Sequence, residues 1–461
     1  MIFIKRNIVC LVICISAING TYGKSIMVSS VDEFKLAQET AKSGDTIVWK
    51  SGKYSDIILD LKVNGVVFRS IQSGATIFTG SSSLAISGST NIVSGFQFVG
   101  GKIKGDIVDI LGSNNKIEHL NFDNYDSHYY LRVRPNCQYN KISYCNFESK
   151  PETQESSVVQ IEASETMIGY HVLSYCSFRN HTAPEGAGGD YGIEALRIGY
   201  SYQRMFTSRT IVEYCYFEKC NGDYEIISCK ARENLIRYNT FNNNGQAHLT
   251  LRHGSLNMVY GNFFLNGAGV RIKEGQNQSV VNNYFDTGDR FSINIQNHHF
   301  DPVDTVIIAN NTFISQGDLI LGGKGDYPPK YVLLANNLFS TKINSFYSEE
   351  TKTESWIGNV LQEGNSKEPS DYFRRAKFEW VENASGFYTP DFRSEFDNNI
   401  GLNSLKIFNI PELDDDYTIK KDIMMGPRVK ELPGSYIPDK TNTLKPYANK
   451  GNTGPEYLLK N

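Results

Sequence analysis

Short apolar segments with the periodicity of β-strands recur along this chain of 461 residues. Pairs such as Leu196 and Ile198, or Leu249 and Leu251, alternate with polar residues, and Gly, Asn or Asp bounds each segment. Helical periodicity is almost absent after residue 43. The pattern therefore predicts many short strands.

A short signature accompanies these strands: an aromatic residue or Asn, two variable residues and then Phe. It ends at nine phenylalanines: Phe122, Phe147, Phe178, Phe217, Phe241, Phe263, Phe285, Phe313 and Phe339. The intervals between them are 25, 31, 39, 24, 22, 22, 28 and 26 residues. A short repeat that insertions lengthen in places is typical of a solenoid.

Strands at this spacing predict an all-β fold, a single-stranded right-handed parallel β-helix. A β-propeller fits less well, because one blade needs four strands in about 40 residues, and these repeats are shorter. In a β-helix, the inward Phe and Asn side chains stack on their equivalents in the next coil, burying apolar surface and pairing amides. Function is then expected on a coil surface and not in a cleft between domains.

The two ends of the chain depart from the repeat. Residues 30–33 read Ser-Val-Asp-Glu, a capping box that predicts a short helix over residues 31–42. Such a helix would cover the open N-terminal end of the coils, where unpaired strand edges recruit other strands. We expect a catalytic β-helix domain over residues 24–360, and the last coils with an irregular extension packed on them over residues 361–461.

Residues 1–23 have the composition of a secretory signal peptide. Lys5 and Arg6 precede an apolar run over residues 8–15, and small and polar residues follow it. The run is too short to span a bilayer, so we expect no membrane span and cleavage near Gly23. Lipid attachment at Cys14 is the less favoured alternative, because residues 11–13 lack small side chains. Export to the periplasm or the medium is predicted.

Charge and cysteine content narrow the function. A formal net charge of −4 excludes a nucleic-acid binder by bulk charge, so a polyanionic partner needs a local cationic patch. Cys145, Cys176 and Cys215 recur at one position of the repeat, which favours a stacked apolar column over a disulfide framework. A disulfide among Cys215, Cys220 and Cys229 stays open, since export permits one.

The residues that could carry chemistry concentrate between positions 190 and 275. Asp223 and Glu225 are two residues apart, hence on one face of a strand, and Lys230 follows at its end. Arg252 comes 22 residues later and points outward if the leucines before it point inward. The same alternation exposes cations on neighbouring coils: Arg197, Arg271 and Lys273.

This arrangement suits β-elimination on a uronic-acid polymer. Asp223 and Glu225, beside Asp190 or Glu194, would form an oxygen-rich site of the kind that Ca²⁺ takes. The proton next to a uronate carboxylate is removable only if the enediolate charge is neutralised. A base must then take this proton, and another group must protonate the leaving glycosidic oxygen.

Two cations on neighbouring coils suit these two roles. Lys230 suits the base, with a pKa lowered by neighbouring arginines and the metal. Arg252 is a cation at any working pH, and it suits charge stabilisation and proton delivery to the leaving group.

At these residues the chain resembles polysaccharide lyase family 6, which holds alginate lyases and chondroitinase B. The resemblance covers most of the chain, from Ala-Lys-Ser-Gly-Asp-Thr-Ile at residues 41–47 to Asn-Asn-Tyr-Phe at residues 282–285. Its specific part is the strand pair that carries Lys230 and Arg252. The resemblance implies a right-handed parallel β-helix, β-elimination at the uronate, Lys230 as base, Arg252 as acid, and Ca²⁺ at Asp223 and Glu225.

The metal ligands differ from the family pattern in detail. The family's third ligand is an Asn upstream of an Arg-Ile-Gly motif, and residues 189–194 leave this ligand open between Asp190 and Glu194. Asp223 stands where Glu is usual, and residues 273–277 lack a His that the family often has.

Several of these residues also have a plainer interpretation. Lys230 could be a solvated corner residue and Arg252 an ordinary strand-flank cation. Asp223 and Glu225 could be a solvated acidic edge. His253 either braces the turn before Gly254 or neighbours the substrate without transferring a proton. Arg197, Arg271 and Lys273 either bind sugar carboxylates or pair with acidic side chains, Glu225 and Glu274.

We therefore expect an exported lyase whose partner is an anionic polysaccharide, first of all alginate. The alternatives are a chondroitinase B-like lyase on dermatan sulfate and a non-catalytic carbohydrate-binding β-helix. A hydrolase of the polygalacturonase kind is disfavoured, because no adjacent Asp pair accompanies Arg271 and Lys273.

Overall fold

The computed structural model describes residues 23–151, 153–187, 189–296, 303–314, 319–322, 328–340, 354–363, 372–391, 421–428, 433–436 and 442–459. Residues 1–22 of the predicted signal peptide, with Cys14, lie outside this part. Among the described residues, no helix is long and apolar enough to cross a lipid bilayer.

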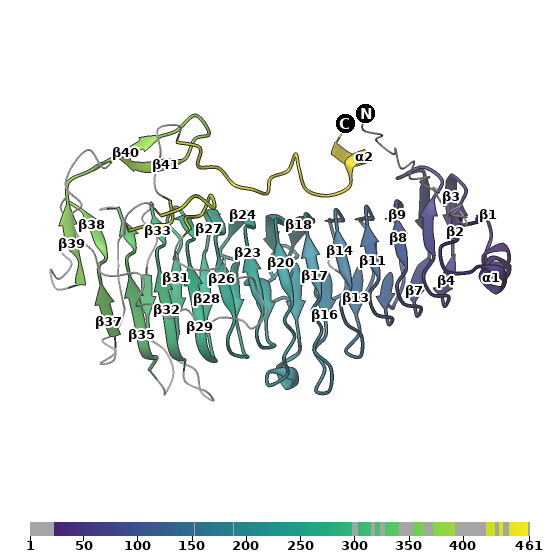
Figure 1. Cartoon of the computed structure of the whole chain (residues 1–461), viewed down its shortest axis with the longest axis horizontal. Coiled ribbons are helices and arrows are strands. Elements are labelled where there is room, and N and C mark those ends of the chain that lie inside the picture. The colour runs from purple at the N-terminus through teal and green to yellow at the C-terminus, as the bar shows by residue number, and fades with distance from the viewer. Residues whose placement is uncertain are drawn as a thin grey trace, which may run out of the picture.

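The chain forms the predicted parallel β-helix, whose coils follow one another along the length of the molecule (Figure 1). Sheet 1 contains β1 (Ser25–Val28), β2 (Thr46–Trp49), β5 (Val67–Ser70), β8 (Ile92–Ser94), β11 (Lys116–Glu118), β14 (Lys141–Ser143), β17 (Val172–Ser174), β20 (Ile211–Glu213), β23 (Leu235–Arg237), β26 (Met258–Tyr260), β29 (Gln276–Val281), β32 (Asp304–Ala309), β35 (Lys330–Ala335) and β37 (Glu354–Ile357). Sheet 2 contains β4 (Ile58–Leu61), β7 (Ser83–Ile86), β10 (Val108–Ile110), β13 (Leu131–Val133), β16 (Val159–Ile161), β19 (Leu196–Ile198), β22 (Glu225–Cys229), β25 (His248–Leu251), β28 (Val270–Ile272), β31 (Ile293–Ile295) and β34 (Leu319–Leu321). Sheet 3 contains β3 (Gly52–Ser55), β6 (Thr76–Thr79), β9 (Phe96–Val99), β12 (Asn121–Asp123), β15 (Asn146–Glu148), β18 (Ser177–Thr182), β21 (Tyr216–Asn221), β24 (Thr240–Gly245), β27 (Phe263–Gly267), β30 (Tyr284–Asp286), β33 (Thr312–Phe313), β36 (Leu338–Phe339), β38 (Val360–Gln362) and β39 (Arg374–Ala376).

The predicted Phe repeat forms a column of stacked rings in sheet 3. From Phe98 to Phe339, consecutive ring centroids lie 4.6 to 5.4 Å apart. Stacked aromatic pairs contribute about 0.5–1.5 kcal/mol each beyond the area that they bury. The column therefore stabilises each coil against its neighbours.

One predicted member of this column is wrong. Phe264, and not Phe263, stacks between Phe241 and Phe285. The register of β24 and β27 pairs Phe241 with Phe264. Successive side chains of a strand point to opposite faces, so Phe263 points outward, where it packs against Phe387 at 5.6 Å.

A second column consists of buried asparagines between sheets 1 and 3. Each side-chain amide donates to the Oδ1 of the next, with N···O distances of 2.9 to 3.1 Å from Asn239 to Asn359. One such hydrogen bond contributes about 1 kcal/mol net, and a buried amide without a partner would cost more. The structure thus confirms that the Asn repeat has a structural role.

The helix α1 (Val31–Thr40) covers the N-terminal end of the coils, as predicted. The Ser30 hydroxyl accepts a hydrogen bond from the Glu33 N–H at 3.2 Å, and Phe34 packs against Phe68 with ring centroids 4.9 Å apart. The helix is two residues shorter than predicted, because Ala41 adopts an extended conformation as its C-cap. Extended backbone at that position ends the helical hydrogen bonding.

The chain after sheet 3 folds back on the coils. It forms the antiparallel hairpin of β40 (Glu379–Glu382) and β41 (Tyr388–Asp391), and later the helix α2 (Glu456–Leu459), which lies near the other end of the molecule (Figure 1). On the way, the Gly434 N–H donates to the Asn336 carbonyl and the Gly454 N–H to the Tyr175 carbonyl, both at 2.8 Å. The C-terminal segment therefore contacts both late and early coils.

The cysteines of the described residues are free thiols. All six are buried, and those at the repeated position bond only weakly to backbone carbonyls: Cys145, Cys176 and Cys215. The apolar column interpretation therefore holds, and no disulfide joins Cys215, Cys220 or Cys229.

Candidate active site

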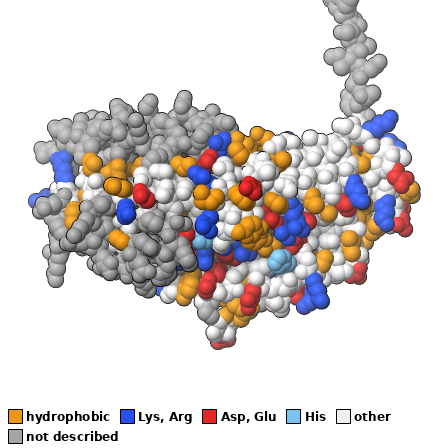
Figure 2. Space-filling view, turned by 90° about the horizontal axis from the view of Figure 1, so that it is seen from below, with side chains coloured by type: hydrophobic (Ala, Val, Ile, Leu, Met, Phe, Trp, Pro, Cys, Tyr) orange, Lys and Arg blue, Asp and Glu red, His pale blue; other side chains and the backbone are white. Residues whose placement is uncertain are grey.

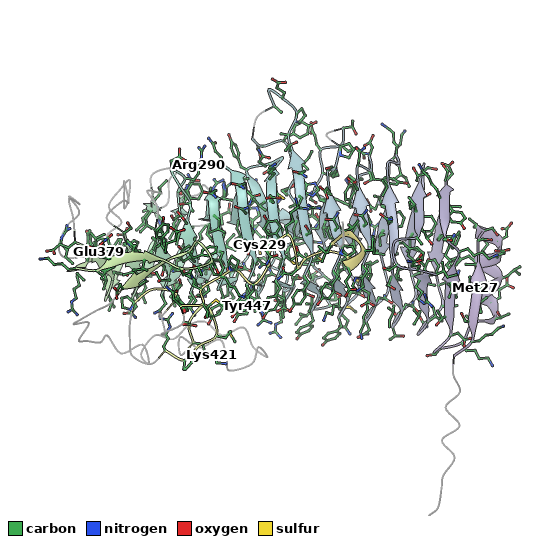
Figure 3. The ribbon with its side chains drawn as sticks, turned by 90° about the horizontal axis from the view of Figure 1, so that it is seen from above. Met27, Cys229, Arg290, Glu379, Lys421 and Tyr447 are labelled. Carbon is green, nitrogen blue, oxygen red and sulfur yellow. The ribbon has the colours of Figure 1, made fainter. Side chains whose placement is uncertain are left out.

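The predicted site residues lie on, or within a few residues of, four neighbouring strands near the middle of sheet 2: β19, β22, β25 and β28. Cys229, directly before Lys230, marks the place along the molecule (Figure 3). The alternate side chains of these strands are buried in the core: Leu196, Ile198, Ile227, Cys229, Leu249, Leu251, Val270 and Ile272. Arg197 and Arg271 therefore face outward, as the alternation predicts.

The parallel register brings Lys230 and Arg252 to adjacent positions. Cys229 pairs with Leu251 across β22 and β25, and the residues that follow these partners are Lys230 and Arg252. The register continues to β28, after which Lys273 takes the equivalent place. Neighbouring strands lie about 4.8 Å apart, so the three cations stand on consecutive coils.

Lys230 is buried, so the plainer interpretation of it as a solvated corner residue does not hold. Its relative exposure is 7%, and within the described residues its ammonium group makes neither an ion pair nor a hydrogen bond. Burial lowers the pKa of Lys230, and Arg197 and Arg252 lower it further against the opposing effect of Glu194 and Glu225. The direction of the shift is the one that a general base requires.

Arg252 is held by a buried carboxylate. Its Nη1 donates to the Glu225 Oε1 at 2.6 Å, and Glu225 also accepts from the Ser228 hydroxyl. Burial opposes the charge of Arg252, but the interaction with Glu225 outweighs it and raises the pKa of Arg252. Arg252 is therefore a fixed cation.

Two further carboxylates lie buried beside this pair. Asp223 accepts hydrogen bonds from the backbone N–H groups of Gly192 at 2.8 Å and of Glu225 at 2.9 Å. Burial and the nearby charge of Glu194 raise the pKa of Asp223 to about 7. Burial also raises the pKa of Glu194, whose Oε2 has no hydrogen-bond partner. Asp190, the other candidate ligand, is exposed.

The buried carboxylates fit the implied Ca²⁺ only in part. No group of three or more His, Cys, Asp or Glu side chains in the described part of the chain is arranged to hold a metal ion. The orphaned Oε2 of Glu194 and the destabilised charge of Asp223 nevertheless match the hard oxygen donors that Ca²⁺ prefers. Glu225 is occupied by Arg252. The Ca²⁺ site stays a prediction, with Glu194 and Asp223 as its best-fitting residues.

Arg271 and Lys273 do not pair with the acidic side chains that could have neutralised them. Glu225 binds Arg252 and Glu274 binds His253, and the side chains of Arg271 and Lys273 make no ion pair within the described residues. Burial lowers the pKa of both groups. Two partly desolvated cations without counterions favour the carboxylate-binding interpretation.

Arg197 is more firmly held. Its Nε donates to the Gln160 Oε1 at 2.8 Å, and its guanidinium lies 3.9 Å from Glu194 and 5.5 Å from the centroid of the Tyr200 ring. His253 braces a turn: Nδ1 pairs with Glu274, and Nε2 lies 3.2 Å from the Ser201 hydroxyl. Ser201 belongs to the 3-10 helix η1 (Ser201–Gln203).

His248 is a residue of this site that the sequence analysis missed. The register pairs it with Glu225 across a β-bulge, which leaves Ile226 as an extra residue. His248 is buried, its Nε2 has no hydrogen-bond partner, and burial lowers its pKa to about 4. The imidazole is thus neutral near pH 7. His248 lies four residues before Arg252, which in a strand indicates the same face. The β-bulge, which the sequence does not reveal, hid its pairing with Glu225.

The site is a row of basic side chains on the outer face of a parallel β-helix. Three of them, Lys230, Arg271 and Lys273, lack ion-pair partners among the described residues. Fold and charge together suit the binding of an anionic polymer.

Comparison with known proteins identifies the class of protein. The model of the chondroitinase B family matches residues 28–342, and the chain belongs to this family, within polysaccharide lyase family 6. This membership favours a lyase over the hydrolase and the non-catalytic alternatives. No curated protein matches the chain.

Solved structures share the fold at low sequence identity. The PL6 family alginate lyase AlyGC has 24% identity and a TM-score of 0.72, over 80% of this chain and 55% of its own, so the chain spans about half of that protein. A mannuronic acid specific family 6 lyase from human gut microbiota has 23% identity and a TM-score of 0.68, over 77% and 91%. The PL6 lyase Pedsa3628 from Pseudopedobacter saltans has 20% and 0.62, over 76% and 95%.

Proposed function

We propose that this protein cleaves a uronic-acid polymer by β-elimination, with Lys230 as the base and Arg252 as the acid. The observation that carries the proposal is the pairing of Cys229 with Leu251, which sets the two cations on adjacent coils. Lys230 is buried, makes no ion pair within the described residues, and has a lowered pKa. Arg252 is fixed by Glu225 at 2.6 Å.

The reaction balances with these two groups. The neutral amine of Lys230 takes the proton from the carbon next to the uronate carboxylate. The electron pair of that C–H bond forms the new C=C bond while the glycosidic C–O bond breaks. The leaving oxygen takes a proton from Arg252, which regains one from water. Because its pKa is raised, Arg252 first stabilises the negative oxygen and gives up the proton only as that oxygen becomes strongly basic.

The remaining cations hold the substrate. Arg271 and Lys273, which have no ion-pair partner among the described residues, bind carboxylates of neighbouring sugars, and Arg197 and His253 border the same surface. Ca²⁺, if bound by Glu194 and Asp223 with the participation of Asp190 or Glu225, would neutralise the uronate carboxylate during proton removal.

Alginate is the proposed substrate, and dermatan sulfate is the second candidate. The alginate lyase AlyGC and the mannuronic acid specific lyase have the same fold, which supports alginate. The matching family model is that of chondroitinase B, which favours dermatan sulfate. Residues 1–23 would direct the enzyme out of the cytoplasm. Polymers of this kind occur outside the cell.

The test is an assay of the purified protein on polymannuronate, polyguluronate and dermatan sulfate. We expect the ultraviolet absorbance of the unsaturated product to rise with at least one of the alginate polymers. A rise with dermatan sulfate alone would select the second candidate. New reducing ends without that absorbance would contradict elimination.

A further inference from the structure

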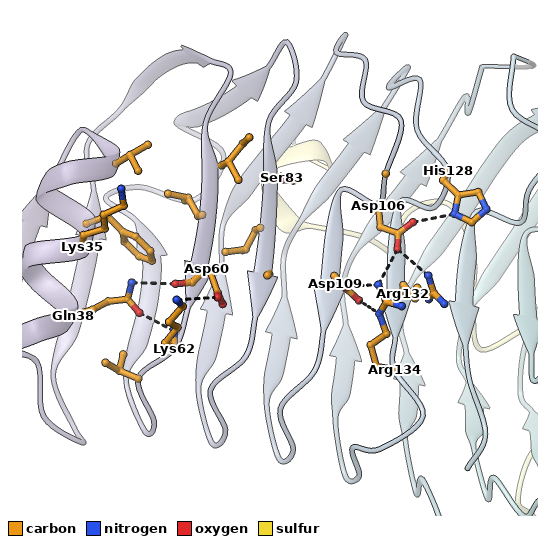
Figure 4. Close-up of a pocket in the computed structure, with 18 of the residues that line it drawn as sticks. Lys35, Gln38, Asp60, Lys62, Ser83, Asp106, Asp109, His128, Arg132 and Arg134 are labelled. Atoms are coloured by element: carbon orange, nitrogen blue, oxygen red, sulfur yellow. Dashed lines mark hydrogen bonds and ion pairs between the residues drawn. The ribbon is translucent and has the colours of Figure 1, made fainter. Parts of the chain in front are cut away.

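A second site lies on the same sheet as the candidate active site, nearer the N-terminus. A cavity of about 870 Å³ opens between the helix α1 and the strands β4, β7, β10 and β13 (Figure 4). Neither Lys230 nor Arg252 lines it. Nothing in the proposed mechanism uses this cavity.

Each basic side chain that lines the cavity has an acidic partner among the described residues. The guanidinium of Arg134 lies 2.7 Å from Asp109, and the imidazole of His128 lies 3.1 Å from Asp106. Arg132 binds Glu162 at 2.5 Å. In contrast to the cations of the active site, these groups offer no unpaired charge to a carboxylate, but their polar atoms still exchange hydrogen bonds with hydroxyl groups.

Part of the cavity wall is apolar. Ile58 is 64% exposed, and the other apolar lining residues include Val31, Val63 and Ala85. A mostly apolar wall with a few polar groups is typical of sites that bind a small molecule or a short segment of a polymer.

An aromatic ridge, whose exposed side chain is Tyr202 and whose Tyr129 is buried, connects the cavity with the active site. The Tyr129 hydroxyl lies 2.9 Å from that of Tyr200, and the Tyr200 ring stacks on Tyr202 with centroids 5.5 Å apart. Tyr202 is 69% exposed. The ridge meets the cavity at His128, whose ring lies 3.9 Å from that of Tyr129, and the active site at Arg197. On the face seen in Figure 2, hydrophobic side chains lie among basic and acidic ones.

The cavity and the active site share one continuous surface. In sheet 2 the register pairs Asp109 with Arg132, Arg132 with Gln160, and Gln160 with Arg197. Six strand spacings of about 4.8 Å separate β4 from β22, so the surface extends over roughly 29 Å. This length accommodates several sugar residues of one polymer chain.

We propose that the cavity and the ridge of Tyr129, Tyr200 and Tyr202 form a distal subsite for the same polysaccharide chain. The inference rests on the proposed function. The subsite binds sugar rings away from the cleavage point: Tyr202 and Ile58 contact their C–H faces, and the paired charged groups bind their hydroxyls. The carboxylates of these sugars face the solvent, since every basic side chain that lines the cavity is already paired within the described part of the chain. The enzyme therefore prefers long chains to short ones.

The test compares the binding of a long and a short ligand. In the Lys230→Ala background, which prevents turnover, Kd is measured by calorimetry for alginate and for an alginate trisaccharide, and in parallel for dermatan sulfate and its tetrasaccharide. We expect Tyr202→Ala, and separately Ala85→Trp, which fills the cavity, to weaken polymer binding about fivefold relative to the short ligand. The matched control is Tyr139→Ala: Tyr139 is 50% exposed and stacks on Tyr170 at 5.0 Å, before β14 of sheet 1.

The outcomes separate this inference from the proposed function. An unchanged ratio of polymer to short-ligand Kd in both variants, or the same change in the control, would overturn the subsite. Polymer that does not bind at all would overturn it as well. The proposed function fails on a different measurement, the absence of unsaturated product from the wild-type protein.

Discussion

Two regions of sheet 2 have the same backbone and different electrostatics. In the coil of β13 the basic side chains are bound to carboxylates: Arg132 to Glu162, and Arg134, directly after the strand, to Asp109 of β10. On the coils that follow β22 and β28, Lys230 and Lys273 have no such partner among the described residues, and their pKa is lowered. Both regions turn one side chain in two toward solvent. The difference therefore comes from the choice of neighbours and not from the fold.

The two regions differ in how much energy their cations can gain by binding a polyanion. A paired cation has already gained its Coulomb energy in the folded protein, whereas a buried cation without a counterion is destabilised until a ligand arrives. A β-helix provides many outward positions for cations. Whether such a cation can bind a polyanion depends on whether the neighbouring coil carries a carboxylate that pairs with it.

The sharpest way to break this comparison is to remove the unpaired amine. Lys230→Ala should lower kcat by about 10³-fold or more, because it removes the amine that we propose takes the proton. Product absorbance gives the rate and circular dichroism the folded state. The control Lys141→Ala changes an exposed lysine at the start of β14 in sheet 1. Turnover that survives in Lys230→Ala would remove Lys230 from the mechanism.

Arg252 tests the comparison of paired and unpaired cations differently, because it is a paired cation within the active site. Arg252→Ala should lower kcat by about 10²-fold and the free energy of unfolding by roughly 3 kcal/mol, because Glu225 is left buried and unpaired. Arg237→Ala breaks a similar pair with Glu213, at 2.5 Å in sheet 1, and should cost stability alone. Urea denaturation and initial rates measure both. A loss of activity in Arg237→Ala would show that the activity lost in Arg252→Ala comes from the broken ion pair and not from the position of Arg252 in the active site.

A smaller effect is expected where the free cations only bind substrate. Arg271→Ala should raise KM about tenfold and leave kcat nearly unchanged, as for an interaction made equally in ground and transition states. Steady-state kinetics over a range of polymer concentrations separate the two constants. An effect on kcat alone would assign Arg271 to the reacting groups.

The smallest effect concerns the carboxylates Glu194 and Asp223. If they hold Ca²⁺, the ion should raise the Tm of the wild-type protein by a few degrees, since it binds only the folded state. Asp223→Asn should abolish this shift. A chelator should also slow the wild-type enzyme, and added Ca²⁺ should restore it. Equal Tm shifts in both proteins would place the ion elsewhere.

The sequence predicted the β-helix, its capping helix and the outward direction of the cations, because these follow from local alternation and repeat length. It failed where two residues compete for one position, as with Phe263 and Phe264. It also failed where partners come from different coils. The burial of Lys230 depends on packing around the coil, and the pairing of His248 with Glu225 depends on a β-bulge.

The distal cavity lay beyond the reach of the sequence for the same reason. Its walls come from α1 and from strands about 25 residues apart, and no single motif marks it. Tyr202 lies in an insertion between repeats, where the pattern predicts neither conformation nor contacts. Such insertions are where solenoids acquire function.

The central claim is that an unpaired, buried lysine acts as the base, and the pH dependence of kcat/KM tests it most directly. Lysine accepts a proton only when neutral, so the rate should fall tenfold per pH unit below its pKa. We predict an acid limb whose midpoint lies below the ordinary lysine value of about 10.4 and well above that of a carboxylate. A midpoint at about 4, or a rate that does not change from pH 5 to 10, would contradict the account.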